Sequence, residues 1–183
     1  MADSTKRLLA PGTVLYPLPA VLVTCGDPTG EKNAITLAWV GTAASEPPCV
    51  VIGVRPTRHS YGLIQRYGDF VVNLPRAGQV DILEYCGAVS GRTEDKFAKT
   101  GITAVRSQNV RAPMVAEFPV NIECKVKNRI ALGSHDLFVA EVLAVHASPE
   151  VLTEGNVDPD KMDPVAYYCG SYYRLGEMIA KRK

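Results

Sequence analysis

The sequence predicts a mainly β protein, in which antiparallel strands form a closed or partly closed barrel with a few short helices. Strand-like runs are short and recur along the chain, separated by turn-forming residues, among them 15 Gly and 13 Pro in 183 residues. Helical patterns are confined to short segments between these runs. No Gly-x-Gly-x-x-Gly motif follows a strand, which argues against a parallel doubly wound fold. We expect one domain over residues 1–183.

The predicted strands in the first half of the chain cover residues 19–25, 33–45, 49–54 and 70–74. The first strand ends at the turn-forming residues 26–30, and the second is poor in large side chains. The third is a continuous apolar run, which is typical of a strand covered on both faces.

Short helices are predicted through Ile64, over residues 80–87, and from a Thr93 cap to Lys99. Strands resume over residues 120–126 and 137–145, joined by a hairpin through residues 131–136. Apolar and polar residues alternate over 120–126, so we expect one face of that strand to be buried and the other to be wet.

Charge and motif content exclude several protein classes. The 20 Lys and Arg nearly balance the 19 Asp and Glu, whereas a nucleic-acid-binding protein normally carries a basic excess. The sequence near residue 1 lacks the apolar stretch of a signal peptide, and no run is long enough to cross a bilayer, so we expect a cytoplasmic protein without membrane association. The five cysteines and three histidines form no CxxC, HxH or HxxxH pair, so we expect reduced thiols and no metal site. P-loop and GxSxG motifs are also absent, which disfavours nucleotide and ester hydrolysis.

Three segments carry polar residues that core packing does not require. The first, residues 33–45, is strand-like and rich in small residues, which let a flat ligand approach backbone donors and acceptors closely. Asn33 and Thr36 would add side-chain hydrogen bonds. A strand packed under a helix needs small residues for the same reason, so both interpretations stay open.

The second segment, residues 55–62, places two arginines, a histidine and hydroxyl groups directly after an apolar strand. If Thr57 or Ser60 caps the helix that follows, the free N–H groups there and Arg58 would form a phosphate site. The third segment, residues 90–97, offers Arg92 and Lys96 for a second phosphate contact. The alternatives are a capped, solvated turn for the second segment and a charged helix face for the third.

The order and spacing of these segments resemble those of the flavin reductase-like, FMN-binding split-barrel family, and within it the flavoredoxin-type branch. The residues that carry the resemblance lie at 33–41, 46–48, 55–61, 70–75, 90–97, 133–142 and 173–176, within a match over residues 13–178. The resemblance implies an antiparallel split β-barrel with a few short helices. It also implies a homodimer, with the flavin in a groove near the subunit boundary.

The resemblance further implies which residues bind FMN. Strand residues would follow the edge of the isoalloxazine ring, while hydroxyl, Arg, His and Lys side chains would surround the phosphate. The expected cofactor-binding residues are Asn33, Ala34, Ile35, Thr36, Leu37, Ala38, Thr57, Arg58, His59, Ser60, Tyr61, Ser90, Gly91, Lys96 and Phe97. No catalytic side chain is assigned, because hydride transfer to a flavin needs no acid or base; His135 is the one candidate near the site.

These observations predict an FMN-binding oxidoreductase, either an NAD(P)H-dependent flavin reductase or a flavoredoxin-like electron carrier. The electron donor would be NAD(P)H or a redox partner protein, and the single compact phosphate site favours FMN over FAD. A non-catalytic FMN-binding or redox-sensing module would use the same residues and is the alternative. A pyridoxal-phosphate or haem-handling barrel is a third, more distant interpretation.

Overall fold

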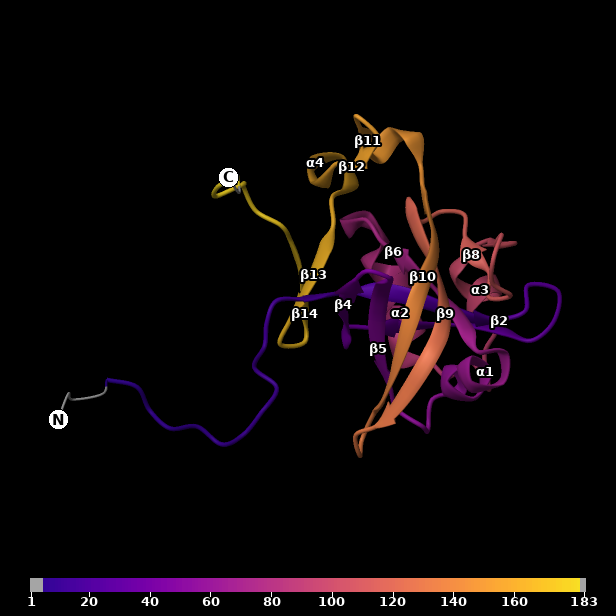
Figure 1. Ribbon diagram of the computed structural model, residues 1–183, viewed down its shortest axis with the longest axis horizontal. Helices are drawn as coiled ribbons and strands as arrows, with labels where there is room; N and C mark the ends of the chain where they lie inside the picture. Colours follow the sequence, from indigo (N-terminus) through magenta and orange to yellow (C-terminus); the bar gives the residue numbers. More distant parts are fainter. Residues whose placement is uncertain (1–4, 182–183) are drawn as a thin grey trace.

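The computed structural model describes residues 5–181 (Figure 1). The central antiparallel sheet contains β2 (Val21–Gly26), β3 (Lys32–Leu37), β4 (Val40–Ser45), β5 (Pro48–Val54), β6 (Asp69–Leu74), β9 (Val120–Ala131) and β10 (Asp136–Ala147). Shorter strands are β1 (Leu18–Pro19), β7 (Ala104–Val105), β8 (Met114–Val115), β11 (Leu152–Thr153), β12 (Asn156–Val157), β13 (Val165–Tyr168) and β14 (Ser171–Arg174). The helices are α1 (His59–Tyr67), α2 (Val80–Ala88), α3 (Lys96–Thr100) and α4 (Pro159–Met162), with 3-10 turns η1 (Ala77–Gln79) and η2 (Pro149–Val151).

The strand order in the central sheet is β3-β2-β6-β9-β10-β5-β4. β3 and β4 are thus its two edge strands, although only Ala38 and Trp39 separate them in the chain. Two residues can join opposite edges of one sheet only if the sheet curls until those edges approach each other. Within residues 5–181 the edges are not paired as strands, so the barrel is split along this line, which we call the seam.

β2 is buried along its whole length because each of its faces packs into a different apolar cluster. On one face, Val21 and Val23 contribute to the cluster inside the curled sheet, together with Phe70 and Phe138, and α1 covers part of it. On the other face, Leu22 belongs to a cluster that joins β2 and β3 to α2 and α3. The two clusters hold β3, the wall of the site described below, between the barrel interior and the helices.

The predicted single strand over residues 33–45 was wrong, because it is two strands that meet at the seam. The Val40 N–H donates to the Ala38 carbonyl (2.9 Å), and the Gly53 N–H donates to the Trp39 carbonyl (2.7 Å). A Cβ at Gly53 would lie 3.1 Å from Trp39 Cβ, so the absence of a side chain there lets the chain turn across β5. The turn itself contains neither Gly nor Pro and left no signal in the sequence.

Three helices occupy the predicted places, but the caps predicted for two of them, α1 and α3, were wrong. Neither Thr57 nor Ser60 caps α1; Arg58 occupies the N-cap position and makes no side-chain cap bond. α3 is capped by Asp95 rather than Thr93, and the Asp95 carboxylate accepts the N–H groups of Phe97 and Ala98. No helix among residues 5–181 is long and apolar enough to cross a membrane.

The predicted wet face on residues 120–126 holds only at Lys125, because Asn121 and Glu123 are buried. The side chain of Glu123 is fully buried, because the loop that leads into β8 lies over this face. The Glu123 carboxylate accepts the backbone N–H groups of Gln108 (2.8 Å) and Asn109 (2.6 Å), and it contacts His146 Nε2 at 2.7 Å. Glu123 therefore holds a loop in place instead of facing solvent, and Asn121, whose Nδ2 donates to the Val115 carbonyl at 3.1 Å, is buried beside it.

β4 and the first half of β5 are more open than the sequence predicted. Coverage on both faces holds only for residues 52–54 of β5, while residues 42–45 of β4 are exposed. β4 is an edge strand, so one side of its backbone also has no strand partner in the described chain.

Candidate functional site

A cavity of about 410 Å³ lies at the seam; we call it the main cavity. Its walls come from the end of β3, the turn after it, the start of the loop after β5, the end of α2, the β9–β10 hairpin and the β13–β14 hairpin. The lining residues are Ala20, Ile35, Thr36, Leu37, Ala38, Trp39, Gly53, Arg55, Arg58, Glu84, Gly87, Ala88, His135, Tyr167, Gly170 and Tyr172.

The edge of β3 that faces this cavity has no strand partner. In an antiparallel strand both backbone groups of one residue point to the same side, and successive residues alternate. The Ala34 carbonyl points away from β2, since it accepts a hydrogen bond from Lys96 Nζ at 2.8 Å. The N–H and C=O groups of Thr36, two residues further on, face the same open side, where they are available to the polar edge of a ligand.

Small residues and one hydrogen bond set the distance between β3 and α2. Thr36 Oγ1 donates to the Leu83 carbonyl of α2 at 2.6 Å. A Cβ at Gly87 would lie 3.4 Å from Thr36 Cβ, so the helix approaches the strand closely at this point. The side chain of Thr36 is therefore used within the protein, and it is the backbone of β3 that remains for a ligand.

Aromatic side chains form the opposite part of the main cavity. The indole of Trp39 and the imidazole of His135 are parallel, with ring centroids 5.8 Å apart and an interplanar angle of 2°. Tyr167 and Tyr172, from the β13–β14 hairpin, pack edge to face with centroids 6.0 Å apart. Flat apolar faces beside a free strand edge suit a planar ligand with polar groups on its rim.

A second, smaller cavity of about 100 Å³ adjoins the first, and both are lined by Ile35, Arg58 and Gly87; we call it the side cavity. Its remaining lining residues are Asn33, Thr57, His59, Cys86, Val89, Ser90, Gly91 and Lys96. The turn after β5 and the turn after α2 therefore face each other across this cavity.

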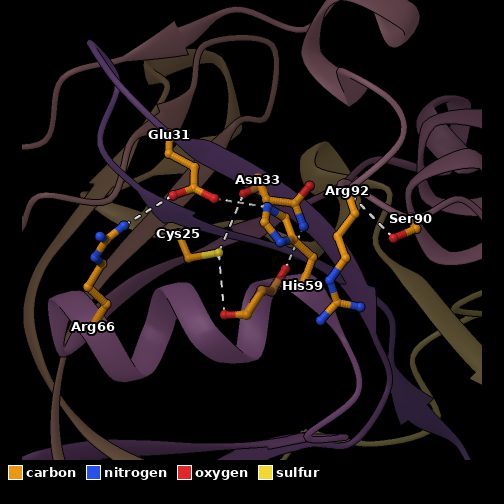
Figure 2. A network of polar contacts seen from close by, with 8 residues as sticks. Cys25, Glu31, Asn33, His59, Arg66, Ser90 and Arg92 are labelled. Atoms are coloured by element: carbon orange, nitrogen blue, oxygen red, sulfur yellow. Dashed lines mark hydrogen bonds and ion pairs between the residues drawn. The ribbon is translucent and has the colours of Figure 1, made fainter.

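A buried polar network supports one wall of the side cavity (Figure 2). Asn33 Nδ2 donates to Ser60 Oγ at 2.8 Å, and the Cys25 thiol lies within 3.8 Å of the carbonyls of Asn33 and Ser60. A Cβ at Gly91 would lie 2.1 Å from Asn33 Oδ1, so only glycine allows the second turn to pack against this network. Burial raises the pKa of Cys25 to about 12, so its thiol is protonated and acts as a hydrogen-bond donor.

Positive charge gathers around the two cavities. Lys96 is 3% exposed and donates to the carbonyls of Ala34 and Cys86, and among residues 5–181 no carboxylate lies within 4.0 Å of Lys96, Arg55 or Arg58. Burial lowers the pKa of Lys96, and the charge of Arg58 lowers it further. Burial, together with Arg55 and Arg58, also lowers the pKa of His135, so that its ring is neutral at pH 7. This end of the site is suited to an anion.

Comparison with known proteins agrees with this geometry. The Flavin reductase like domain matches residues 13–176. The chain belongs to the flavin reductase-like domain family. An uncharacterized protein of Archaeoglobus fulgidus is 33% identical to it over 131 residues, which make up 72% of this chain and 73% of that protein.

Two solved structures place the chain in the flavoredoxin-type branch of the family. Flavoredoxin of Desulfovibrio vulgaris (Miyazaki F) is 35% identical, with a TM-score of 0.90 and 97% of both chains covered. Flavoredoxin from Methanosarcina acetivorans is 29% identical, with a TM-score of 0.91 over 97% of this chain and 95% of that one. The predicted split β-barrel and the flavoredoxin-type resemblance are thus confirmed.

The structure brings most residues of the predicted flavoredoxin-type site to the two cavities. Ile35, Thr36, Leu37, Ala38 and Arg58 line the main cavity. Asn33, Thr57, His59, Ser90, Gly91 and Lys96 line the side cavity.

Four predicted residues line neither cavity. The side chains of Ala34 and Phe97 belong to the cluster between β2 and the helices, and Ser60 lies beneath Asn33. Tyr61 is turned toward β10, where its hydroxyl donates to Asp136 Oδ2 at 2.6 Å and accepts from Arg129 at 2.8 Å. These side chains support the walls of the cavities from behind.

The sequence analysis missed more than half of the residues that line the main cavity. Trp39 reaches it through the turn between β3 and β4, which was not predicted, and Gly53 of β5 lies beside that turn. Tyr167 and Tyr172 come from a hairpin more than a hundred residues away from β3, and no local pattern links them to it. Gly87 carried a weak signal, since a glycine within a predicted helix indicates a close approach.

Proposed function

We propose that this chain is an FMN-binding oxidoreductase of the flavin reductase or flavoredoxin type, which passes electrons from NAD(P)H or a redox partner protein through bound flavin. One observation carries the proposal: the main cavity, with its free strand edge and flat aromatic faces, opens at Arg58 into a small cavity lined by cations and hydroxyls. FMN is a planar ring with polar edges and a phosphate tail, and it needs these two environments side by side.

Each part of the site has a role in this proposal. The backbone of Thr36 would bond to the polar edge of the ring, and Trp39 and His135 would bound the mouth of the main cavity. Arg58, Lys96, Thr57 and Ser90 would surround the phosphate, where Lys96 has one N–H left after its two bonds to backbone carbonyls. The domain would extend over residues 1–183, with its core at residues 13–178.

The flavin supplies the electron-transfer chemistry when it is bound, and the protein binds, orients and shields it. Arg55 and Arg58, which have no carboxylate partner within 4.0 Å in the described part of the chain, would favour the binding of an anionic ligand over that of a neutral ligand. The neutral His135 ring, whose Nδ1 lies 2.9 Å from Ser134 Oγ, would offer a polar contact at the mouth without adding charge. No side chain is assigned a proton-transfer step.

We further propose a cytoplasmic homodimer. Large apolar side chains are almost fully exposed in the segments that flank the barrel, among them Leu15 and Ile179, and the flank of β4 is open as well. Both flanking segments extend beyond the barrel on the side of β13 and β14 (Figure 1). A second copy that covered these surfaces would remove apolar area from water, and sedimentation velocity would show whether it does.

The decisive experiment is an absorbance spectrum of the purified protein, followed by addition of NADH and then of NADPH under nitrogen. Bound flavin would give an absorbance band at about 450 nm. Bleaching of that band by either nucleotide would support the reductase. A yellow protein that both nucleotides leave unchanged would favour a carrier fed by another protein or the non-catalytic module. A protein that neither carries nor binds FMN would refute the proposal.

A further inference from the structure

A single arginine bridges the two turns that line the side cavity. Arg92 Nη1 donates to the Thr57 carbonyl at 2.9 Å, and so it joins the turn after α2 to the turn after β5. Thr57 lines the side cavity, as do Ser90 and Gly91, the two residues that precede Arg92. Within residues 5–181 this is the only hydrogen bond between the two turns, and it joins exposed residues.

Two surface hollows lie beyond this bond, and Arg92 lines both of them. One, of about 540 Å³, shares His59 and Gly91 with the side cavity; the other, of about 470 Å³, shares Arg58 and His59 with it. Figure 2 shows Arg92 extending from the Ser90 side past His59. A ligand that continued outward from the side cavity would therefore pass between Gly91 and Thr57, where Arg92 crosses.

The charges of the larger hollow add a second barrier. Three carboxylates, those of Glu31, Glu94 and Asp95, face it together with Lys32 and Arg92. A second phosphate that entered this hollow would meet the carboxylates of Glu94 and Asp95, while Glu31 is paired with Arg66 at 3.2 Å. The side cavity itself, at about 100 Å³, has room for one phosphate group but not for a nucleotide.

We propose that Arg92 is a specificity-determining residue, whose bond to Thr57 closes the side cavity behind one phosphate and thereby selects flavin mononucleotides against flavin dinucleotides. The inference rests on the proposed flavin-binding function and names the class of flavin that the same site accepts. FMN ends at the phosphate and leaves the bond intact. FAD continues through a second phosphate to an adenosine, and it can bind only if the bond is broken.

The test compares dissociation constants for FMN, FAD and riboflavin in the wild-type protein and in Arg92→Ala and Arg92→Met. Arg66→Ala is the matched control, because Arg66 also lines the smaller hollow but pairs with Glu31 at 3.2 Å and does not reach Thr57. We expect the wild type to bind FMN at least about tenfold more tightly than FAD. Both Arg92 variants should narrow this ratio by about fivefold or more through tighter FAD binding, while Arg66→Ala leaves it unchanged.

Riboflavin, which has no phosphate, reports on the main cavity alone, and its affinity should stay within about twofold in every variant. Equal affinity of the wild type for FMN and FAD would overturn the proposal. An equal loss of FMN and FAD affinity in both Arg92 variants would also overturn it, since Arg92 would then be a phosphate ligand. Absence of binding of all three flavins to the wild type would instead refute the proposed function itself.

Discussion

The ammonium group of Lys96 lies 2.8 Å from the carbonyl oxygen of Ala34 and 2.7 Å from that of Cys86. One cation thus fixes the free edge of β3 to the last turn of α2, the two elements that border the passage between the main and side cavities. A buried cation without a carboxylate partner is costly, and an anion in the side cavity would offset that cost. Lys96 would therefore couple the shape of the strand edge to the occupancy of the proposed phosphate site.

The pH dependence of FMN binding tests this coupling. Burial lowers the pKa of Lys96 below its ordinary value of 10.5, and a bound phosphate would favour the protonated form. FMN affinity should therefore fall as the pH rises through this lowered pKa, and titrations of the protein with FMN at several alkaline pH values would measure it. The flavin ring also ionises at alkaline pH, and riboflavin binding measures that contribution. Lys96→Met is the control for the lysine. It should bind FMN more weakly, and its FMN affinity should depend on pH only as much as its riboflavin affinity does.

Arg58→Ala should weaken FMN binding by about 10- to 150-fold, since it removes a charge-assisted bond worth about 1.5–3 kcal/mol. Equilibrium titration followed by flavin fluorescence would measure the change. Arg66→Ala removes an arginine of the same helix region that is already paired with Glu31, and it should have little effect. If riboflavin lost as much affinity as FMN in Arg58→Ala, the phosphate role of Arg58 would be wrong.

Trp39 provides a direct signal of ligand binding, because it is the single tryptophan of the chain and lines the main cavity. We expect FMN and riboflavin to quench its fluorescence in a saturable manner. Trp39→Phe should abolish the signal and retain binding within about tenfold, since an aromatic face remains. FMN binding detected by equilibrium dialysis without any quenching would place the flavin elsewhere.

Gly91→Ala should destabilise the side cavity. The new Cβ would lie 2.1 Å from Asn33 Oδ1, so the buried bond from Asn33 to Ser60 or the turn itself must shift, at a cost of about 1–3 kcal/mol. Thermal unfolding and FMN titration should show both a lower Tm and weaker FMN binding. Gly62→Ala, in the middle of α1 with open space around the new Cβ, is the matched control and should stabilise the protein by about 0.5–1 kcal/mol.

Glu123→Gln should lower the free energy of unfolding and reduce its dependence on pH in acid. Burial raises the pKa of Glu123, but the N–H groups of Gln108 and Asn109 and the contact with His146 outweigh burial and hold this pKa below its ordinary value of 4.5. A carboxyl with a lowered pKa stabilises the folded state above its unfolded pKa, and this contribution is lost as the pH falls through the lowered value. The stability of the wild type should therefore drop below about pH 4.5.

The Glu123→Gln variant should lose about 1–3 kcal/mol at pH 7, and its free energy of unfolding should fall less steeply with acid. Urea unfolding at several pH values from about 3 to about 7 would measure both quantities. This range includes the titration of carboxyls at about pH 3–5. Glu150→Gln, which disrupts an exposed ion pair with Arg76, should cost less than about 1 kcal/mol. Equal acid slopes in the wild type and in Glu123→Gln would contradict the role of Glu123.

The sequence was informative where the signal is local. The apolar run before Arg55 predicted β5, and the polar residues that follow it predicted a turn at the start of α1. Both patterns depend only on residues that are neighbours in the chain. The apolar run that begins at Phe70 likewise predicted β6. Asp95 was overlooked as a cap because Thr93 also fits the pattern, and two candidate caps two residues apart cannot be ranked without the backbone.

What the sequence could not supply depends on chain closure. Trp39 lines the main cavity only because β3 and β4 are opposite edges of one sheet, and that follows from the pairing of β5 with β10 far along the chain. Glu123 looked like an exposed residue of an alternating strand, since nothing local shows that a loop covers it. Tyr172 enters the site from the last strand, after the rest of the barrel has defined where that strand can lie.

The seam between β3 and β4 separates the binding of a ligand from the integrity of the barrel. Because strand pairing stops at this line, the side chains of Trp39 and His135 at its mouth contribute contact surface, although the Trp39 carbonyl still accepts the Gly53 N–H of β5. Substitutions there can change which molecule approaches the ligand and leave the folding pathway and the strand register untouched. Under the proposed function, such a layout would let one scaffold diverge toward many electron acceptors while it keeps the same flavin-binding residues.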